Sequence, residues 1–226
     1  MTVLIFSKAS AGEFLADMVR EVEEDSMTMN NERNVATTAR TYTFRIRVLV
    51  LMGVSGCGKS AVGEAVAGHW QAGFEDADLW HSPEAVAKMA AGHPLTDDDR
   101  APWLERLRGK IIAATPADGR TVLACSALRR CYRDALCLGQ EGVQFIYLSG
   151  TRELIADRMN RRHGHYMPAT LLDSQFAALE VPAPEEAVTV SIDQSLEGVV
   201  ADVMAVLGRS DGVGCHPGEI SGPLET

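Results

Sequence analysis

GVSGCGKS, at residues 53–60, is the most informative stretch of this chain of 226 residues. It fits the pattern G-x-x-x-x-G-K-[ST], whose glycines let the backbone turn so tightly that its N–H groups face a bound phosphate. The apolar run RVLVLM precedes it and SAVGEAVAGHW follows from its last residue, as a strand and a helix would. The helix N-terminus adds the positive end of its dipole. The sequence therefore predicts a nucleotide-binding loop between a buried strand and a helix.

Two side chains of this loop have chemical roles that its backbone cannot fill. The ammonium group of Lys59 would span the β- and γ-phosphates of a nucleotide, and the hydroxyl of Ser60 would hold Mg²⁺. We therefore expect ATP and Mg²⁺ to bind here. The expected ATP-binding residues of the loop are Gly53, Val54, Ser55, Gly56, Cys57, Gly58, Lys59 and Ser60.

Apolar runs of strand length alternate with helical stretches around the loop. The runs lack a clean apolar–polar alternation, which favours strands buried on both faces. Their β-α-β order predicts an α/β fold, a parallel sheet with helices on both faces. The expected strands are Arg47–Met52, Gly73–Ala77, Thr121–Cys125, Val143–Leu148 and Ala187–Ile192. The expected helices lie near residues 59–70, 83–91, 98–114, 128–137, 151–163, 168–180 and 195–207.

The chain divides into three zones. Residues 47–208 form the expected compact domain. Residues 1–46 form an N-terminal extension, with one amphipathic helix followed by a polar linker. That helix could dock a partner or a second subunit, it could be loosely attached, or the start codon could be placed too early. Residues 209–226 are rich in glycine, proline and small polar residues, which indicates a flexible tail.

The charge and hydropathy of the chain exclude several classes of protein. Its net charge is −10, from 21 basic and 31 acidic residues, which argues against a nucleic-acid coat built on clustered positive charge. No apolar run approaches the roughly 18 residues of a membrane helix. The N-terminus lacks the pattern of a signal peptide. We expect no nucleic-acid partner, no membrane partner and a cytoplasmic location.

The loop alone does not define a reaction. Small GTPases also need D-x-x-G after a strand and N-K-x-D for guanine, but the second motif is absent and the first occurs only in the tail, at residues 211–214. Motor and AAA-type ATPases need a strand that ends in acidic residues, whereas Thr121–Cys125 is followed by Ser-Ala-Leu. These exclusions leave a small-molecule kinase of the nucleotide-kinase type.

Two carboxylates stand at the end of the second expected strand. Asp76 and Asp78 lie on the same side of the chain, at the edge of a parallel sheet where ligands bind. Phosphoryl transfer needs carboxylates to hold the Mg²⁺ shell and to accept the proton of the attacking hydroxyl. Asp76 suits the first role and Asp78 the second. A plain turn, where aspartate is favoured anyway, is the alternative.

Basic and aromatic residues mark an expected acceptor side. Arg100 could grip a carboxylate with two parallel hydrogen bonds. Lys88 could bind an anionic group or lie on a solvated helix face, and Trp103 could pack on a substrate or belong to the core. Ser126, after the third strand, faces the same sheet edge as the loop. Thr96 is expected to cap the helix that carries Arg100.

The segment between Thr151 and Tyr166 is locally basic in an acidic chain. Arg158, Arg161 and Arg162 are spaced three and four residues apart, which places them on one helical face. We expect a lid near residues 151–167 that closes over a triphosphate and excludes water. Its arginines would neutralise charge on the transferring phosphoryl group. A solvated basic helix is the alternative.

From Val48 to Leu207 the chain resembles the gluconate kinases of the P-loop type, relatives of shikimate kinase. The resemblance implies transfer of the γ-phosphate of ATP to the 6-hydroxyl of D-gluconate, giving 6-phosphogluconate. It implies a three-layer P-loop kinase fold with a lid, a five-stranded parallel sheet in the order 2-3-1-4-5, and a homodimer. The segments on which the resemblance rests are GVSGCGKS at 53–60, DADLWH at 76–81, KMAAGHPLTDDDRAPWL at 88–104, CSALRRCYRD at 125–134, GHYMPATLLDSQFAALEVP at 164–182 and VSIDQSLEGVV at 190–200.

The resemblance also implies a role for individual residues. Asp193 and Gln194 would lie in the adenine loop, and Ser60 and Asp76 complete the expected metal site. The expected catalytic residues are Lys59, Asp78, Arg158 and Arg162. The expected substrate-binding residues are Asp78, His81, Lys88, Arg100, Trp103, Ser126, Arg129, His165 and Gln175.

One departure from the family pattern concerns the acceptor. Ala85 stands where the family often has asparagine, which removes one possible hydrogen bond to the substrate. A kinase for a related sugar acid or polyol is therefore an alternative. A nucleotide-binding regulator without turnover is another, although the intact Lys59 and Asp78 argue against it.

Overall fold

Strand β1 (Val48–Met52) is the centre of the molecule because all five of its side chains are apolar and fully buried. Val48, Val50 and Met52 belong to a core on one side of the sheet, and Leu49 and Leu51 belong to a core on the other. The computed structural model describes residues 45–161 and 169–208. The predicted extension and tail lie almost wholly outside these residues, so the division into three zones stays a prediction.

The five strands are all parallel and follow the order β2-β3-β1-β4-β5, which confirms the predicted sheet. Val50 of β1 lies opposite Leu123 on one neighbour and Phe145 on the other. Every carboxyl end therefore meets one edge of the sheet, the place where ligands bind in such folds. The other four strands are β2 (Gly73–Asp76), β3 (Thr121–Ala124), β4 (Val143–Ser149) and β5 (Ala187–Ser191).

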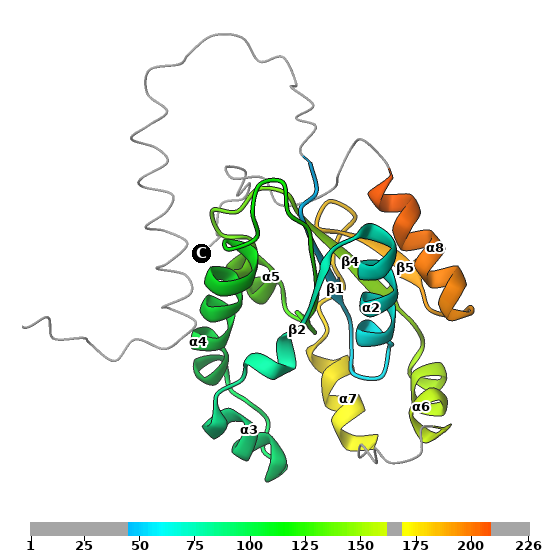
Figure 1. Ribbon diagram of the computed structural model, residues 1–226. Coiled ribbons are helices and arrows are strands. Elements are labelled where there is room, and N and C mark those ends of the chain that lie inside the picture. Colours follow the sequence, from blue (N-terminus) through cyan, green and yellow to red (C-terminus); the bar gives the residue numbers. More distant parts are fainter. Residues whose placement is uncertain (1–44, 162–168, 209–226) are drawn as a thin grey trace, which may run out of the picture.

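Helices cover both faces of the sheet and give the three layers seen in Figure 1. α2 (Lys59–Trp70) and α8 (Leu196–Leu207) pack on one face, with α4 (Asp97–Leu107) and α5 (Arg130–Cys137) on the other. The remaining described α-helices lie at the carboxyl edge of the sheet. They are α3 (Pro83–Ala90), α6 (Arg152–Arg161) and α7 (Ala169–Ala178).

Two short helical segments differ from the helices and strands predicted from the sequence. The 3₁₀ turn η1 (Ala77–Trp80) is capped by Asp76, whose carboxylate accepts a hydrogen bond from the backbone N–H of Asp78 at 3.0 Å. The π-helical segment η2 (Arg108–Ile112) continues α4, and the N–H of Ala113 donates to the carbonyl of Arg108 at 2.8 Å. The predicted helix over 98–114 is therefore an α-helix followed by a wider π turn.

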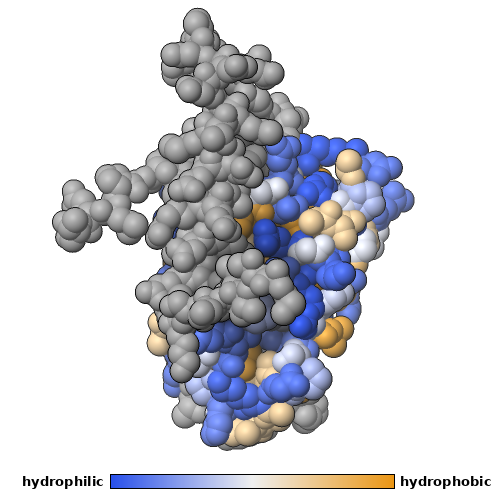
Figure 2. Space-filling model, turned by 90° about the vertical axis from the view of Figure 1, so that its left-hand side faces the viewer, coloured by the Kyte–Doolittle hydropathy of each residue, from blue (hydrophilic) through white to orange (hydrophobic). Residues whose placement is uncertain are grey.

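The visible described surface is mainly hydrophilic. Figure 2 shows one face, on which apolar side chains are scattered rather than gathered. Leu79 and Val181 are the most exposed large apolar side chains among the described residues, at 83% and 67%. No helix in the described ranges has the length and apolar character needed to cross a membrane.

Gln144 is a fully buried polar residue within β4. Its Nε2 donates to the carbonyl of Phe145 at 2.8 Å, but its Oε1 has no hydrogen-bond partner. A buried polar atom without a partner loses its hydration and gains nothing in return. We expect Gln144→Met to raise the free energy of unfolding by about 1 kcal/mol, measured by urea denaturation. A lower stability in the variant would show that the amide does contribute.

Candidate active site

The phosphate loop, residues 53–60, has the predicted place between β1 and α2 and depends on glycine. Gly53, Gly56 and Gly58 have φ angles of 141°, 83° and 100°, in the region that side chains disfavour. A Cβ atom at Gly56 would lie 2.6 Å from the side chain of Met159. The loop is therefore tight and lies directly against α6.

The cation and the hydroxyl of the loop contact groups nearby. Lys59 Nζ donates to the carbonyl oxygens of Gly53 and Val54, each at 3.0 Å. Ser60 Oγ donates to Asp76 Oδ2 at 2.8 Å. Hydroxyl and carboxylate oxygens are ligands that Mg²⁺ accepts, and Mg²⁺ usually binds one or two carboxylates together with substrate phosphates. Ser60 and Asp76 therefore fit the predicted metal site.

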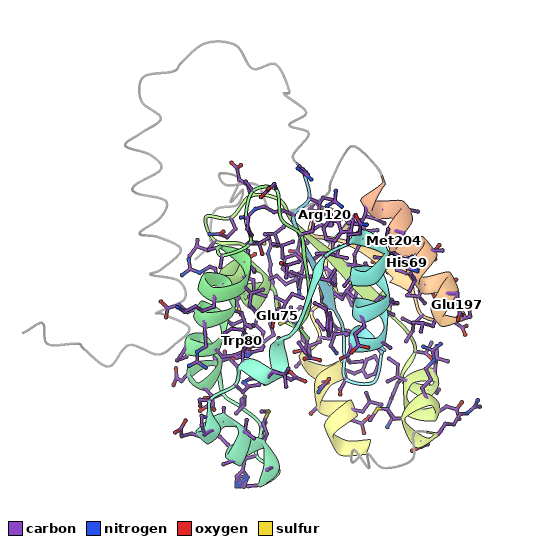
Figure 3. The ribbon with its side chains drawn as sticks, in the orientation of Figure 1. His69, Glu75, Trp80, Arg120, Glu197 and Met204 are labelled. Atoms are coloured by element: carbon purple, nitrogen blue, oxygen red, sulfur yellow. The ribbon has the colours of Figure 1, made fainter. Side chains whose placement is uncertain are left out.

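Asp78 lies on η1, beside this pair. Its side chain is exposed, and its carboxylate has no hydrogen bond or ion pair with the described residues. The turn around it is held firmly: Trp80 Nε1 donates to Glu75 Oε2 at 3.2 Å, and Arg106 donates to the carbonyl of Trp80 at 2.8 Å. Glu75 and Trp80 are labelled in Figure 3. Asp78 is thus a carboxylate on a rigid support, free to accept a proton.

A cavity of about 350 Å³ opens between the phosphate loop, α6 and the start of α8. Arg158 donates to the carbonyls of Ile192 and Gln194, the second at 3.1 Å, and both arginine and glutamine line the cavity. Its volume lies in the usual range of small-molecule sites, and its apolar walls suit a nucleobase. The lining residues are Gly56, Cys57, Gly58, Ala61, Val62, Arg158, Met159, Arg161, Ile192, Gln194, Leu196 and Val199.

The exposed Asp193 stands directly before Gln194, after the end of β5. The structure therefore brings the predicted adenine loop together with Arg158, one of the predicted lid arginines. Arg161, another of the predicted lid arginines, also lines the cavity, whereas Arg162 and His165 lie outside the described residues.

Two thiols lie under the loop and at the end of β3. Cys57 is 1% exposed, and burial raises its pKa, although Lys59 nearby opposes this effect. Burial raises the pKa of Cys125 to about 12. Both thiols are therefore protonated at neutral pH.

Carboxylates of α4 pair with two of the predicted acceptor-side cations. Lys88 Nζ lies 2.5 Å from Asp99 Oδ2, and this hydrogen bond lowers the pKa of Asp99 to about 2. Asp99 also forms the capping box of α4 with Thr96, which confirms the predicted cap. Arg129 lies 2.7 Å from Asp97.

Tyr132, on α5, completes this group. Its hydroxyl donates to Asp97 Oδ1, and this hydrogen bond lowers the pKa of Asp97. The guanidinium of Arg100 lies 5.6 Å from the centre of the Tyr132 ring and donates to the carbonyl of Leu95. In the described part of the chain no carboxylate pairs with Arg100. Of the three predicted acceptor-side cations Lys88, Arg129 and Arg100, only Arg100 therefore lacks a carboxylate partner among the described residues.

The rings of His81 and Trp103 stack, with centroids 4.4 Å apart and planes 12° from parallel. Trp103 is 5% exposed, and its Nε1 donates to the carbonyl of Ala77 at 2.9 Å. It is therefore a core residue that fastens α4 to η1, the second of the two roles considered for it. His81 Nδ1 is buried without a hydrogen-bond partner.

We expect His81 to titrate below its usual pKa of about 6.5. Burial of the imidazole lowers the pKa most; Asp78 raises it, whereas Arg100 and Arg106 lower it. Because the pKa of His81 is lower in the folded chain, the unfolded chain binds the proton first. The free energy of unfolding should therefore decrease as the pH falls from 6.5 to the folded pKa. The ring-proton NMR signal of His81, assigned with a His81→Gln variant, measures this midpoint. A midpoint at or above 6.5 would contradict the expectation.

The residues 125–130, called the acceptor loop here, are tied to the phosphate loop and to α7. The N–H of Gly53 donates to the carbonyl of Ser126 at 3.2 Å, and the N–H of Glu180 donates to the carbonyl of Leu128 at 2.9 Å. Ser126 therefore contributes its backbone to the phosphate loop. The next residue, Ala127, has a φ of 40°, which a non-glycine residue adopts only when its surroundings impose it.

Arg133 on α5 holds these segments together. Its side chain is 5% exposed and donates to the carbonyls of Ala127, Leu128 and Glu180 at 3.1–3.3 Å. Its Nη2 also lies 2.6 Å from Glu186 Oε2. The sequence analysis missed both Arg133 and Tyr132, because the only local signal was their position in a helix after the acceptor loop.

Gln175 was predicted in the segment that faces the sugar acid, and in the structure its side chain contacts the phosphate loop. The N–H of Ser55 donates to Gln175 Oε1 at 2.6 Å, across 120 positions of the chain. No signal in the sequence points to this contact. The structure thus brings most of the predicted residues to one edge of the sheet.

Comparisons with known proteins agree with this geometry. The family model of shikimate kinase matches residues 55–202. The thermoresistant gluconokinase of Escherichia coli (strain K12) is 43% identical over 164 residues, which cover 72% of this chain and 94% of that protein. The gluconokinase of Gluconobacter oxydans (strain 621H) is 44% identical over 142 residues, 63% of this chain and 80% of that protein.

A solved structure gives the same result for the fold. The crystal structure of a gluconokinase from Sinorhizobium meliloti 1021 superimposes with a TM-score of 0.68 at 41% identity, covering 74% of this chain and 94% of that one. Sheet order, phosphate loop and relatives therefore agree: the chain belongs to the gluconokinase family of P-loop kinases.

Proposed function

We propose that this protein transfers the γ-phosphate of ATP to the 6-hydroxyl of D-gluconate, giving 6-phospho-D-gluconate and ADP. The observation that carries the proposal is a pair of opposite charges at the sheet edge that form no ion pair with the described residues. Asp78 and Arg100 both interact electrostatically with His81, and Arg100 contacts the Tyr132 ring and the Leu95 carbonyl but no described carboxylate. A carboxylate near the phosphate loop and a guanidinium without a carboxylate partner suit a substrate that has a hydroxyl at one end and a carboxylate at the other.

In the proposed mechanism, Asp78 accepts the proton of the 6-hydroxyl as its oxygen attacks the γ-phosphorus. The bond from that phosphorus to the β–γ bridging oxygen breaks, and ADP leaves. Lys59 turns from the carbonyls of Gly53 and Val54 to the phosphates and stabilises the charge that develops. Ser60 and Asp76 would hold Mg²⁺, which neutralises phosphate charge when bound.

The remaining predicted residues have supporting roles. Arg100 anchors the gluconate carboxylate, while Lys88, His81 and Arg129 shape the acceptor site around it. Arg158, with Arg162 beyond the described residues, closes the nucleotide side, and His165, also beyond them, faces the sugar acid. Asp193 and Gln194 contact the adenine.

A coupled assay of ADP release tests this proposal. ATP and Mg²⁺ are offered with D-gluconate, other sugar acids, neutral polyols or no acceptor, and the product is identified by ³¹P and ¹³C NMR. We expect turnover with gluconate and phosphorylation at C6. Protein that binds ATP but shows no gluconate-dependent turnover would exclude the proposal, and faster turnover with another sugar acid would identify the alternative substrate.

The family resemblance also supports a homodimer in the cytoplasm. Light scattering after size-exclusion chromatography measures the mass of the assembly, and fractionation of cells measures its location. A monomer at micromolar concentration would exclude the dimer.

A further inference from the structure

Gln175 has a contact that the proposed mechanism does not use. Its amide oxygen accepts the backbone N–H of Ser55 at 2.6 Å, near the Gly53 end of the phosphate loop. We propose that Gln175 recognises the γ-phosphate: it occupies the N–H of Ser55 when the γ-phosphate is absent, and donates its amide N–H to a γ-phosphoryl oxygen when ATP is bound. This inference deepens the proposed function and rests on it.

The position of Ser55 along the loop points to the γ-phosphate. On one side, Gly56 to Gly58 line the cavity suited to the nucleobase. On the other, Gly53 contacts Ser126 of the acceptor loop. A triphosphate that runs from the cavity to the acceptor must therefore place its last phosphoryl group at the Gly53 end. Ser55 lies at that end and does not line the cavity.

The helix that carries Gln175 is fastened on both sides of it. Leu172, one turn earlier, is 2% exposed and packs in the core under α2 and α8. Glu180, just beyond α7, bonds through its N–H and its carbonyl to the acceptor loop and to Arg133, and its Oε2 accepts the N–H of Arg130 at 2.6 Å. The amide of Gln175 therefore reaches the loop from a fixed support and not from a mobile surface.

The chemistry of the side chain suits two different partners. A glutamine amide carries an acceptor oxygen and a donor NH₂ group on one planar unit, so a half-turn about its last bond exchanges them. In the structure the oxygen accepts the backbone N–H of Ser55. A phosphoryl oxygen requires a donor instead, and the turned amide supplies one. Lysine or arginine could serve the second state but not the first, because neither has an acceptor.

The two states predict a preference for ATP over ADP that depends on Gln175. ADP leaves the bond between Gln175 and Ser55 in place, whereas ATP replaces it with a charge-assisted hydrogen bond. A hydrogen bond to a charged group contributes more than a hydrogen bond between neutral groups. The difference of about 1 kcal/mol corresponds to roughly a fivefold preference.

The test measures binding of Mg²⁺–ADP and of a non-hydrolysable Mg²⁺–ATP analogue by calorimetry, without any sugar acid. We expect Gln175→Met, which keeps the length and loses both hydrogen-bonding groups, to weaken the ATP analogue about fivefold relative to ADP. Gln175→Glu should weaken the ATP analogue relative to ADP by more than about tenfold, because its carboxylate repels the γ-phosphate. The thermal midpoint of each variant confirms that it is folded.

Gln140→Met is the matched control. Gln140 lies in the turn before β4, at the opposite edge of the sheet, where its Oε1 accepts from Arg47 at 3.3 Å. It should leave the affinities for both nucleotides unchanged. If Gln175→Met weakens the binding of both nucleotides equally, or of neither, Gln175 does not recognise the γ-phosphate and the proposal is wrong. The binding ratio is independent of gluconate turnover, so failure of the proposed function would appear separately.

Discussion

Asp78→Asn should lower kcat for gluconate about a thousandfold, because the amide cannot accept the proton of the attacking hydroxyl. The substitution keeps the size of the side chain. Asp78 is exposed, and its carboxylate bonds to none of the described residues, so the fold should not change. Lys59 and the phosphate loop are untouched, and nucleotide affinity should stay close to that of the wild type.

Steady-state ADP release and calorimetry measure these two quantities. Asp118→Asn is the control, since Asp118 is exposed in the turn before β3, at the edge opposite the site. It should leave kcat unchanged. A variant at Asp78 that keeps more than about a tenth of the wild-type kcat would mean that another group accepts the proton.

Arg133→Met should lower the free energy of unfolding by about 3 kcal/mol, because it breaks a buried ion pair and leaves Glu186 with only the exposed Arg130 as its partner. Glu186, its partner at 2.6 Å, has a side chain that is 16% exposed. The carbonyls of Ala127, Leu128 and Glu180 lose their donor at the same time. Activity should fall as well, since these carbonyls position the acceptor loop.

Urea denaturation with tryptophan fluorescence measures this change. Arg130→Met, on the same helix, is the matched control: its side chain is 68% exposed, so its ion pairs, with Asp134 and also with Glu186, are those of an exposed cation. Such pairs contribute about 0–1 kcal/mol. A loss below about 1 kcal/mol for Arg133→Met would show that the buried guanidinium does not hold these segments together.

The sheet could be predicted to within one residue at each strand end. The strands are short apolar runs bounded by turns, and a run such as Val48–Met52 is apolar throughout because it faces two cores. The phosphate loop could be predicted equally well, since its function requires particular residues at fixed spacing. The cap at Thr96 followed from local chemistry for the same reason.

The partners of the charged residues could not be predicted. The sequence does not distinguish which of the cations Lys88, Arg129 and Arg100 has a partner. In the structure the first two pair with carboxylates of α4 and the third does not. Which cation stays free depends on distances between α3, α4 and the acceptor loop that only the folded chain defines. The contact between Gln175 and Ser55 likewise joins residues 120 positions apart.

Cys57 has a practical consequence for inhibitor design. A thiol within a phosphate loop looks like a handle for covalent drugs, but electrophiles react with the thiolate and need access to it. Cys57 is protonated and only 1% exposed. The same burial protects it from peroxide, whose first product would be a sulfenic acid. Cys57 should therefore react slowly both with alkylating agents and with peroxide.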